Sequence, residues 1–139
     1  MNKKTSLGFT LIELIAVLII LGLIASIVAP NVMKRVGGAR AKTARVQVEE
    51  LGAALDLFFL ELGRYPSSDE GLQALVEQPS DARQWNGPYL KKTKVPEDPW
   101  GNPYRYESPG KHGDYDLASL GADNAEGGED DNADVASWE

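Results

Sequence analysis

The sequence predicts an α+β fold in which one long N-terminal α-helix packs on a small antiparallel β-sheet. Two observations lead to this fold class. An apolar run near the N-terminus passes directly into a helical pattern of apolar residues that reaches residue 62. Near the C-terminus, short strand-like segments flank a turn. A chain of 139 residues has room for such an anchor and one modest domain.

The first half of the predicted helix is long and apolar enough to cross a membrane. Residues 9–30 read FTLIELIAVLIILGLIASIVAP and hold a single charge, Glu13. About 20 apolar residues span the roughly 30 Å hydrocarbon layer. Lys3 and Lys4 precede the run, so the positive-inside tendency keeps the N-terminus in the cytoplasm. A removed secretory signal is the alternative, because small residues at 25–29 weakly imitate a cleavage site.

The second half of the helix, residues 31–62, is predicted to be amphipathic. Apolar residues at three- and four-residue steps form one stripe: Val36, Ala39, Thr43, Val46, Leu51, Leu55, Phe58 and Leu62. Both halves together make one helix from about residue 10 to about residue 61, roughly 78 Å long. Pro30 is expected to kink it or open it locally, and Gly63 followed by Pro66 ends it.

The remaining residues predict short elements joined by loops. Ser67 and Glu70 have capping-box spacing, which predicts a second helix over about residues 69–78. Strands are expected at 104–108 and 115–120, on either side of the turn PGKHGD. Residues 135–138 are a candidate last strand, with Trp138 packing inward. Residues 80–103 read as loop, including the turn-forming stretch DPWGNPY, which we interpret as structural.

Charge is distributed unevenly along the chain. The total is −7, and residues 1–45 carry seven bases against one acid, a net +6, which leaves −13 for residues 46–139. Such an acidic exported part argues against a nucleic-acid partner and suits a cation. No enzyme is expected either, because the chain has no cysteine, no nucleophile elbow or phosphate loop, and one histidine, His112, in a turn.

Residues 121–134, GADNAEGGEDDNAD, form an acidic, glycine-rich segment that we call the acidic loop. One interpretation is a solvated, flexible loop. The other is a calcium (Ca2+) site, because calcium takes roughly six to eight oxygens from carboxylates, carbonyls and water. Asp130, Asn132 and Asp134 begin like an EF-hand, but no glycine or distal glutamate follows at the required spacing. The residues alone exclude the EF-hand and leave both interpretations open.

The N-terminus carries a more specific pattern than its apolar composition. A basic leader, MNKKTSLG, ends at Gly8 and is followed by Phe9-Thr10-Leu11-Ile12-Glu13. This arrangement resembles the class III signal of type IV pilins and related pseudopilins. The resemblance implies cleavage between Gly8 and Phe9 by a prepilin peptidase, and N-methylation of Phe9. Because the cut precedes the apolar run, the run stays in the mature protein as an anchor.

Several stretches of the exported part resemble one family within the pilin group, the major pseudopilin of the bacterial type II secretion system. They are ALDLFFLELGRYPSSDEGLQALVEQP, GPYLKK, DPWGNPYRYESPGKHGDYDLASLGAD, EGG and ADVASW, so the resemblance runs from Gly8 to Trp138. The stretch DPWGNPY is more specific than the signal, which all pilins share. The absence of cysteine also favours a pseudopilin, since type IV pilins often close their C-terminal region with a disulfide.

The resemblance implies a structural subunit that polymerises into the periplasmic pseudopilus and drives export of folded proteins across the outer membrane. It implies a leader (1–8), a transmembrane and filament-core helix (9–30), an amphipathic helix (31–62) and an exported α+β domain (63–139). The implied location is the inner membrane, with one pass and the C-terminal domain in the periplasm. Implied partners are other copies of the chain, the prepilin peptidase, minor pseudopilins and the inner-membrane assembly platform. A lone membrane-anchored calcium module or a type IV pilus subunit are the alternatives.

The resemblance also implies roles for individual residues. It strengthens the calcium interpretation of the acidic loop, with Asp123, Asp134 and the backbone carbonyl of Leu120 as the ligands that match the family pattern. Asp130 and Asp131 lie in a stretch that varies in the family, so one can ligate while the other faces solvent. Glu13 is implied to pair with the Phe9 amine of an adjacent subunit, the alternative being an acid tolerated near the membrane interface.

Overall fold

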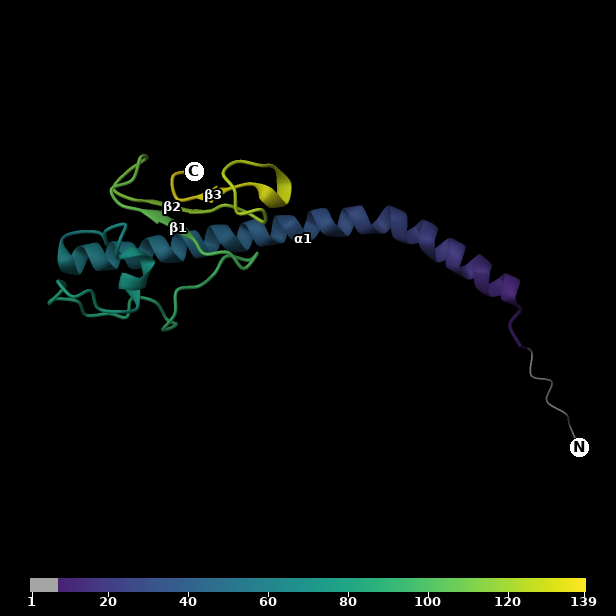
Figure 1. Ribbon diagram of the computed structural model, residues 1–139, viewed down its shortest axis with the longest axis horizontal. Coiled ribbons are helices and arrows are strands. Elements are labelled where there is room, and N and C mark those ends of the chain that lie inside the picture. Colours follow the sequence, from purple (N-terminus) through teal and green to yellow (C-terminus); the bar gives the residue numbers. More distant parts are fainter. Residues whose placement is uncertain (1–7) are drawn as a thin grey trace, which may run out of the picture. The chain divides into compact units, whose positions relative to one another are not determined.

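The computed structural model describes residues 8–139, so the basic part of the leader, with Lys3 and Lys4, lies outside the described residues. The element order is α1 (Leu11–Leu62), η1 (Gly71–Leu75), β1 (Arg105–Glu107), β2 (Asp116–Ser119), η2 (Asp130–Asn132) and β3 (Val135–Ala136) (Figure 1). The predicted α+β class is therefore confirmed. The chain forms two compact units, one ending at Val36 and one comprising Gly37–Glu139. The second unit contains residues 63–139, whose export is a prediction from the sequence, and for that reason we call the whole unit the exported domain.

The predicted long helix is confirmed as α1, which covers 52 residues without a break and ends just before Gly63. The helix continues through Pro30, so the local opening expected there is not present in this structure. The part of α1 in the first unit is exposed throughout, and no residue of its apolar membrane-length window is buried. Apolar side chains without cover in water need lipid or other helices around them.

The helix α1 buries one face against the rest of the exported domain. The residues on this face differ in part from the apolar stripe predicted from the sequence. Leu51, Leu55 and Phe58 are fully buried as expected. Upstream of them, however, Val46 is 53% exposed, whereas Val48 and Ala44 are buried. Val36, Ala39 and Thr43 are exposed as well, so the prediction of Val36, Ala39, Thr43 and Val46 as buried positions is wrong. Steps of three and four residues backwards from Leu51 lead to Val48 and Ala44. The small side chain of Ala44 lets neighbouring segments pack close to the helix.

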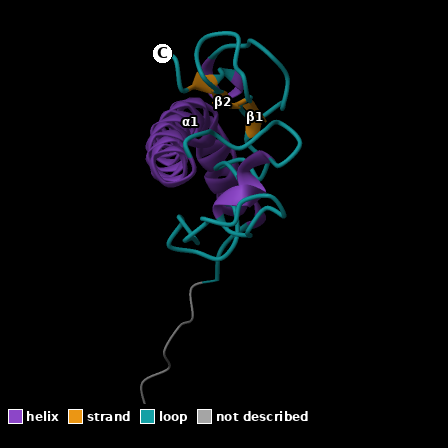
Figure 2. Ribbon diagram, turned by 90° about the vertical axis from the view of Figure 1, so that its left-hand side faces the viewer, coloured by secondary structure: helices purple, strands orange, loops and turns teal. Residues whose placement is uncertain are grey.

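The three strands form an antiparallel sheet in the order β1-β2-β3 beside the outer half of α1 (Figures 1 and 2). All four residues of β2, the central strand of the sheet, are buried. Leu117 of β2 and Val135 of β3 join the helix side chains and Leu75 in a single core. This sheet fixes the two ends of the acidic loop, which leaves β2 and returns as β3.

Two shorter elements differ from their predictions. The expected helix over residues 69–78 is only the 3₁₀ helix η1, although its capping box is present: Ser67 and Glu70 exchange hydrogen bonds of 2.7 and 3.2 Å. Gly71 has φ +59°, a left-handed conformation that ends any α-helix begun at Asp69. Trp138 does not pack inward but is 44% exposed. Val135 is buried and side chains alternate along a strand, so a residue three positions on faces the other way.

Candidate functional site

The start of α1 is built by a reciprocal capping box that the sequence analysis did not identify. The Thr10 amide donates to Glu13 Oε2 at 2.9 Å, and the Glu13 amide donates to Thr10 Oγ1 at 3.3 Å. The Thr10 hydroxyl also donates to the same carboxylate oxygen at 2.9 Å. Spacing T-x-x-E is the sequence signal for this cap. In the uncleaved chain the Glu13 carboxylate is thus hydrogen-bonded to Thr10, the second residue after the predicted cleavage site.

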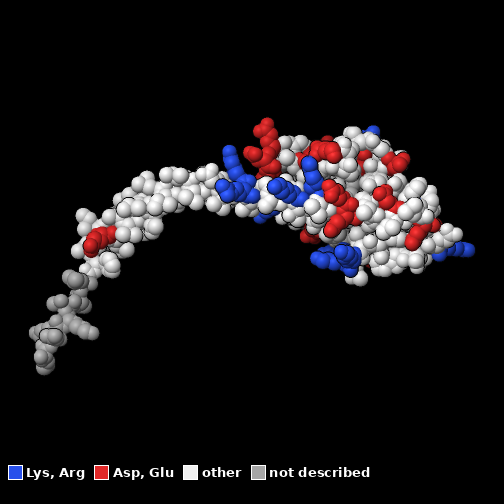
Figure 3. All heavy atoms as spheres, turned by 180° about the vertical axis from the view of Figure 1, so that it is seen from behind, with Lys and Arg blue, Asp and Glu red and all other residues white. Residues whose placement is uncertain are grey.

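The uncharged stretch that follows Glu13 is unusually long. Residues 14–33 contain no Asp, Glu, Lys or Arg, and Figure 3 shows a white stretch of α1 between one acidic side chain near the start of the helix and the first basic side chains. Among the described residues α1 is the one helix that is long and apolar enough to cross a membrane. Acidic side chains instead gather over the exported domain.

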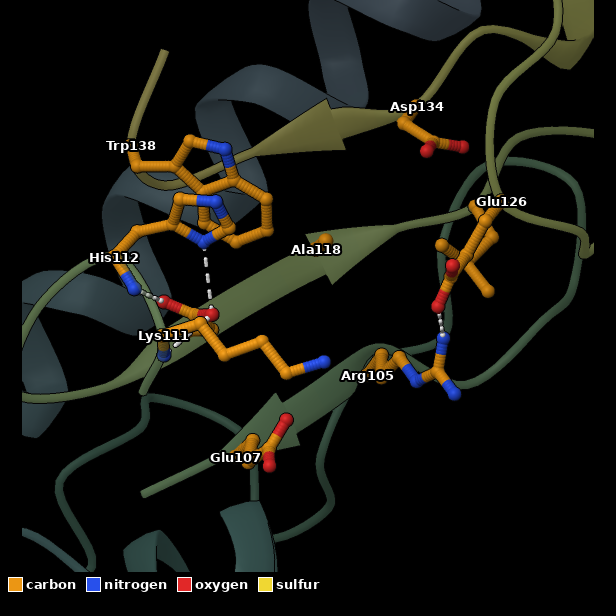
Figure 4. Close-up of a pocket in the computed structure, with 10 residues that line it drawn as sticks. Arg105, Glu107, Lys111, His112, Ala118, Glu126, Asp134 and Trp138 are labelled. Carbon is orange, nitrogen blue, oxygen red and sulfur yellow. Dashed lines mark hydrogen bonds and ion pairs between the residues drawn. The ribbon is translucent and has the colours of Figure 1, made fainter. Parts of the chain in front are cut away.

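The acidic loop brings Asp134 and Leu120 to one hollow on the outer face of the sheet. This hollow has a volume of about 260 Å³ and is lined by both residues together with Glu126, Arg105 and Trp138, among others (Figure 4). Asp134 Oδ2 accepts a hydrogen bond from the Gly127 amide at 2.9 Å. Its Oδ1 is buried and has no hydrogen-bond partner among residues 8–139. A buried carboxylate oxygen without a donor is costly unless a cation satisfies it.

Glu126 is a member of this hollow that the predicted ligand set lacks. Its carboxylate points toward Arg105 and forms an ion pair with it, as Figure 4 shows. Both side chains are more than half exposed, so the pair is weak. Sequence spacing could not identify Glu126, because its position relative to Asp134 depends on how the glycines fold the loop.

The other predicted ligands lie apart from this hollow. Asp123 is exposed, and its Oδ1 accepts the Ala125 amide at 3.1 Å in a local turn. Asp130 is exposed and has φ +54°. Asp131 is directed toward other parts of the domain, where Trp100 Nε1 donates to it at 2.8 Å. Within residues 8–139, no group of three or more His, Cys, Asp or Glu side chains is placed to hold one metal ion.

His112 lies at the opposite end of the same hollow. Its ring stacks on the Trp138 indole, with centroids 4.1 Å apart and planes 9° from parallel. Nδ1 lies 2.9 Å from Asp116 Oδ2, and the Lys111 and His112 amides donate to the same carboxylate. Although burial alone would raise it, these hydrogen bonds hold the pKa of Asp116 below its ordinary value. The predicted turn histidine therefore holds the C-terminal residues against the β1–β2 turn.

The DPWGNPY stretch has a structural role, built on Asp98, whose side chain is buried. Asp98 Oδ1 accepts the amides of Trp100 and Asn102 at 3.0 and 2.8 Å. Asp98 Oδ2 accepts the Ser119 hydroxyl at 2.6 Å, and Ser119 is fully buried at the end of β2. The turn in this way presents Trp100 to the acidic loop. Asn102 adds a second link, because Nδ2 donates to the Gly121 carbonyl at 3.0 Å.

Comparison with known proteins places this arrangement in a family. The family "Type II secretion system (T2SS), protein G" matches residues 31–138, and the "Prokaryotic N-terminal methylation motif" matches residues 3–29. The chain belongs to the type II secretion system protein G family. The predicted resemblance to type II secretion pseudopilins is thereby confirmed.

Individual relatives of the protein G family cover almost the whole chain. "Type II secretion system core protein G" of Pseudomonas aeruginosa is 46% identical, over 100% of this chain and 99% of its own length. The protein of the same name from Vibrio cholerae is 43% identical, over 99% and 94%. The crystal structure of the major pseudopilin from the type 2 secretion system of enterohaemorrhagic Escherichia coli has a TM-score of 0.66 at 32% identity. It covers 78% of this chain and 95% of that one.

Proposed function

We propose that this protein G family member is a structural subunit that polymerises, through its N-terminal helix, into the pseudopilus that exports folded proteins. The observation that supports this most is the exposed apolar half of α1, joined to a compact domain whose core does not need it. A membrane shelters this half before assembly, and neighbouring copies shelter it in a filament. Repeated head-to-tail contacts between identical subunits generate helical filaments.

The proposal includes the topology and partners that the family membership leaves open. The chain spans the bacterial inner membrane once, with the N-terminus in the cytoplasm and the exported domain in the periplasm. The prepilin peptidase cleaves between Gly8 and Phe9, and Phe9 is then N-methylated. The partners are further copies of the chain, the minor pseudopilins and the inner-membrane assembly platform. Its role is mechanical, so we assign no catalytic residue.

Electron microscopy of cells that produce the chain with a prepilin peptidase tests the proposal. Fibres that contain this chain are expected. A protein that is processed and stays a monomer in the membrane would instead favour the alternative of a lone membrane-anchored module. Fibres that reach the cell surface at native expression levels would favour the type IV pilus subunit.

Glu13 is proposed to pair with the Phe9 amine of an adjacent subunit, and its capping box makes a sharp test possible. Glutamine at position 13 keeps an acceptor for the Thr10 amide but carries no charge. Alanine removes both. If pairing matters, Glu13→Gln and Glu13→Ala both lose filaments while cleavage after Gly8 continues. If the cap is what matters, Glu13→Gln assembles normally and only Glu13→Ala fails.

Calcium is proposed as the ligand of the acidic loop, held by Asp123, Asp134 and the Leu120 carbonyl. The partnerless Oδ1 of Asp134 and an all-oxygen donor set support a hard cation there. When bound, calcium supplies positive charge that neutralises the loop and links it to β2 and β3. Asp134 and Leu120 already line one hollow, whereas Asp123 is not among the residues that line it, so binding requires the loop to bring Asp123 to the other two. Equilibrium dialysis with calcium, with Asp134→Ala as the variant that fails to bind, tests this assignment.

A further inference from the structure

We propose that Asp131 is a positioning residue that fastens the acidic loop to α1 and to the DPWGNPY turn, and that it does not ligate calcium. Its effect on calcium affinity rests on the calcium proposal above. Its fastening role does not, because every contact involved is made by the protein itself. One acid of the loop thus anchors it, and the other acids remain free to bind.

Both carboxylate oxygens of Asp131 already face protein donors. The Trp100 indole donates to Oδ1 at 2.8 Å, and both side chains are partly buried. Arg40 Nη1 lies 3.8 Å from Oδ2. The Arg40 pair is nearly half exposed and is a weak ion pair. The indole hydrogen bond to a charged acceptor is the stronger contact. By contrast, Asp134 Oδ1, two residues after the end of η2, has no donor among the described residues.

The helix surface beneath Asp131 is shaped to receive it. Gly37 is buried, and a Cβ at that position would lie 2.9 Å from Asp131 Oδ1 and 3.3 Å from its Cγ. Only glycine lets the carboxylate approach the helix this closely without a shift. The neighbouring Gly38 has nothing within 4 Å of the same hypothetical atom. Of two adjacent helical glycines, the one under Asp131 is therefore the one with a packing reason.

The backbone of Asp131 extends the anchor toward the first proposed ligand. Its carbonyl accepts the Ala122 amide at 2.9 Å, directly before Asp123. Gly121 is held in turn by Asn102 of the DPWGNPY turn. Asp131 consequently fixes where the outgoing and returning arms of the loop lie relative to each other. Residues that orient ligands in this way typically change metal affinity by about 10-fold to 100-fold when replaced.

The fastening role is tested first in calcium-free mature protein in detergent micelles. The chain has three tryptophans, so three indole N–H signals are expected in a ¹⁵N NMR spectrum, each assigned by a Trp→Phe variant. The Trp100 signal should shift and exchange faster with water in Asp131→Ala. Proteolysis of the loop should speed up by about tenfold in Asp131→Ala and in Trp100→Phe alike. The matched control is Trp85→Phe, because the Trp85 indole donates to the Ala74 carbonyl and not to the loop. This variant should leave the rate of loop proteolysis unchanged.

A Trp100 signal that is unchanged in Asp131→Ala, or a loop that is cleaved at the wild-type rate in both variants, would overturn the fastening role. This result is independent of calcium. Calcium-free measurements thus separate failure of this inference from failure of the calcium proposal, which would appear as a wild-type chain that binds no calcium.

Calcium titration then separates a positioning residue from a ligand. Trp100→Phe removes the indole donor and leaves the Asp131 carboxylate in place, so it should weaken calcium binding by about tenfold or more if Asp131 positions the loop. The double variant Trp100→Phe/Asp131→Ala should bind no more weakly than Asp131→Ala alone. Wild-type affinity in Trp100→Phe, together with a loss in Asp131→Ala as complete as in Asp134→Ala, would make Asp131 a ligand and refute the inference.

The glycine pair gives an independent test that leaves every polar group in place. Gly37→Ala should displace the Asp131 carboxylate and accelerate loop proteolysis, whereas Gly38→Ala should not. Both changes raise helix propensity equally, so a difference between them reports the contact with Asp131. Equal proteolysis of the two variants at the wild-type rate would contradict the close approach on which the inference depends.

Discussion

Replacement of Asp98 by alanine is expected to destabilise the exported domain by about 3–5 kcal/mol. Asp98 is 5% exposed, and its carboxylate accepts three hydrogen bonds, from Trp100, Asn102 and Ser119. Hydrogen bonds to a charged group contribute roughly 1.5–3 kcal/mol each. Water can reach the two partly buried amides and replace part of that loss. It cannot reach the fully buried Ser119 hydroxyl, so the total lies below the simple sum of three bonds.

Urea unfolding of the mature chain in micelles, followed by tryptophan fluorescence with calcium chelated, measures this loss. A domain of this size is stable by only about 5–15 kcal/mol, so the midpoint should fall markedly at unchanged slope. Asp98→Asn keeps one oxygen for the two amides, and the Ser119 hydroxyl can turn to accept from the new amide group. We expect about 1–2 kcal/mol for it. Exposed Asp69→Ala is the control, and a loss below about 1 kcal/mol for Asp98→Ala would refute the reasoning.

Three further predictions concern stability. Arg64 donates two hydrogen bonds to Glu70, at 2.7 and 2.9 Å, and lowers its pKa to about 2. The Arg64–Glu70 interaction therefore adds to the free energy of unfolding. This contribution is complete above the unfolded pKa of about 4.5 and is lost as pH falls toward 2. The unfolding curves of wild type and Glu70→Gln should consequently converge on acidification and stay apart at neutral pH. Val48→Ala should cost about 2 kcal/mol because Val48 is buried, while Val46→Ala should cost little because Val46 is exposed; equal costs would contradict the phase of α1. Calcium at 100 times its dissociation constant should stabilise the domain by about 2.7 kcal/mol, and a melting temperature unchanged by a chelator would argue against the calcium site.

The sequence predicted the length of α1 because its signals are local. The apolar run, the helical spacing and the stop at Gly63 and Pro66 all lie on one segment. The buried face upstream of Leu51 was not predictable in the same way. Two overlapping stripes exist there, and Val46 is more apolar than the Ala44 that is actually buried. Which of the two stripes is buried depends on how the sheet and the acidic loop pack on α1, because they approach small residues of the helix closely.

The candidate site shows the same division between composition and arrangement. The family resemblance implied the individual ligands in the acidic loop. Composition predicted only that the loop is acidic and suits a cation, because carboxylates and glycines are visible in the chain. It could not predict that Asp131 bonds Trp100 across 31 positions, or that Glu126 joins the hollow of Asp134. Both follow from how the loop folds onto distant segments. Trp138 was misplaced for a simpler reason: the buried phase of β3 is set by Val135.

The central claim is that the exposed apolar half of α1 becomes the core of a filament made of this chain. Electron cryomicroscopy of fibres assembled from peptidase-processed protein tests it most directly. We predict fibres in which residues 9–30 of neighbouring copies pack at the centre and the exported domains lie outside. A processed chain that remains monomeric in the membrane, or a fibre held together by exported domains without these helices, would contradict the account.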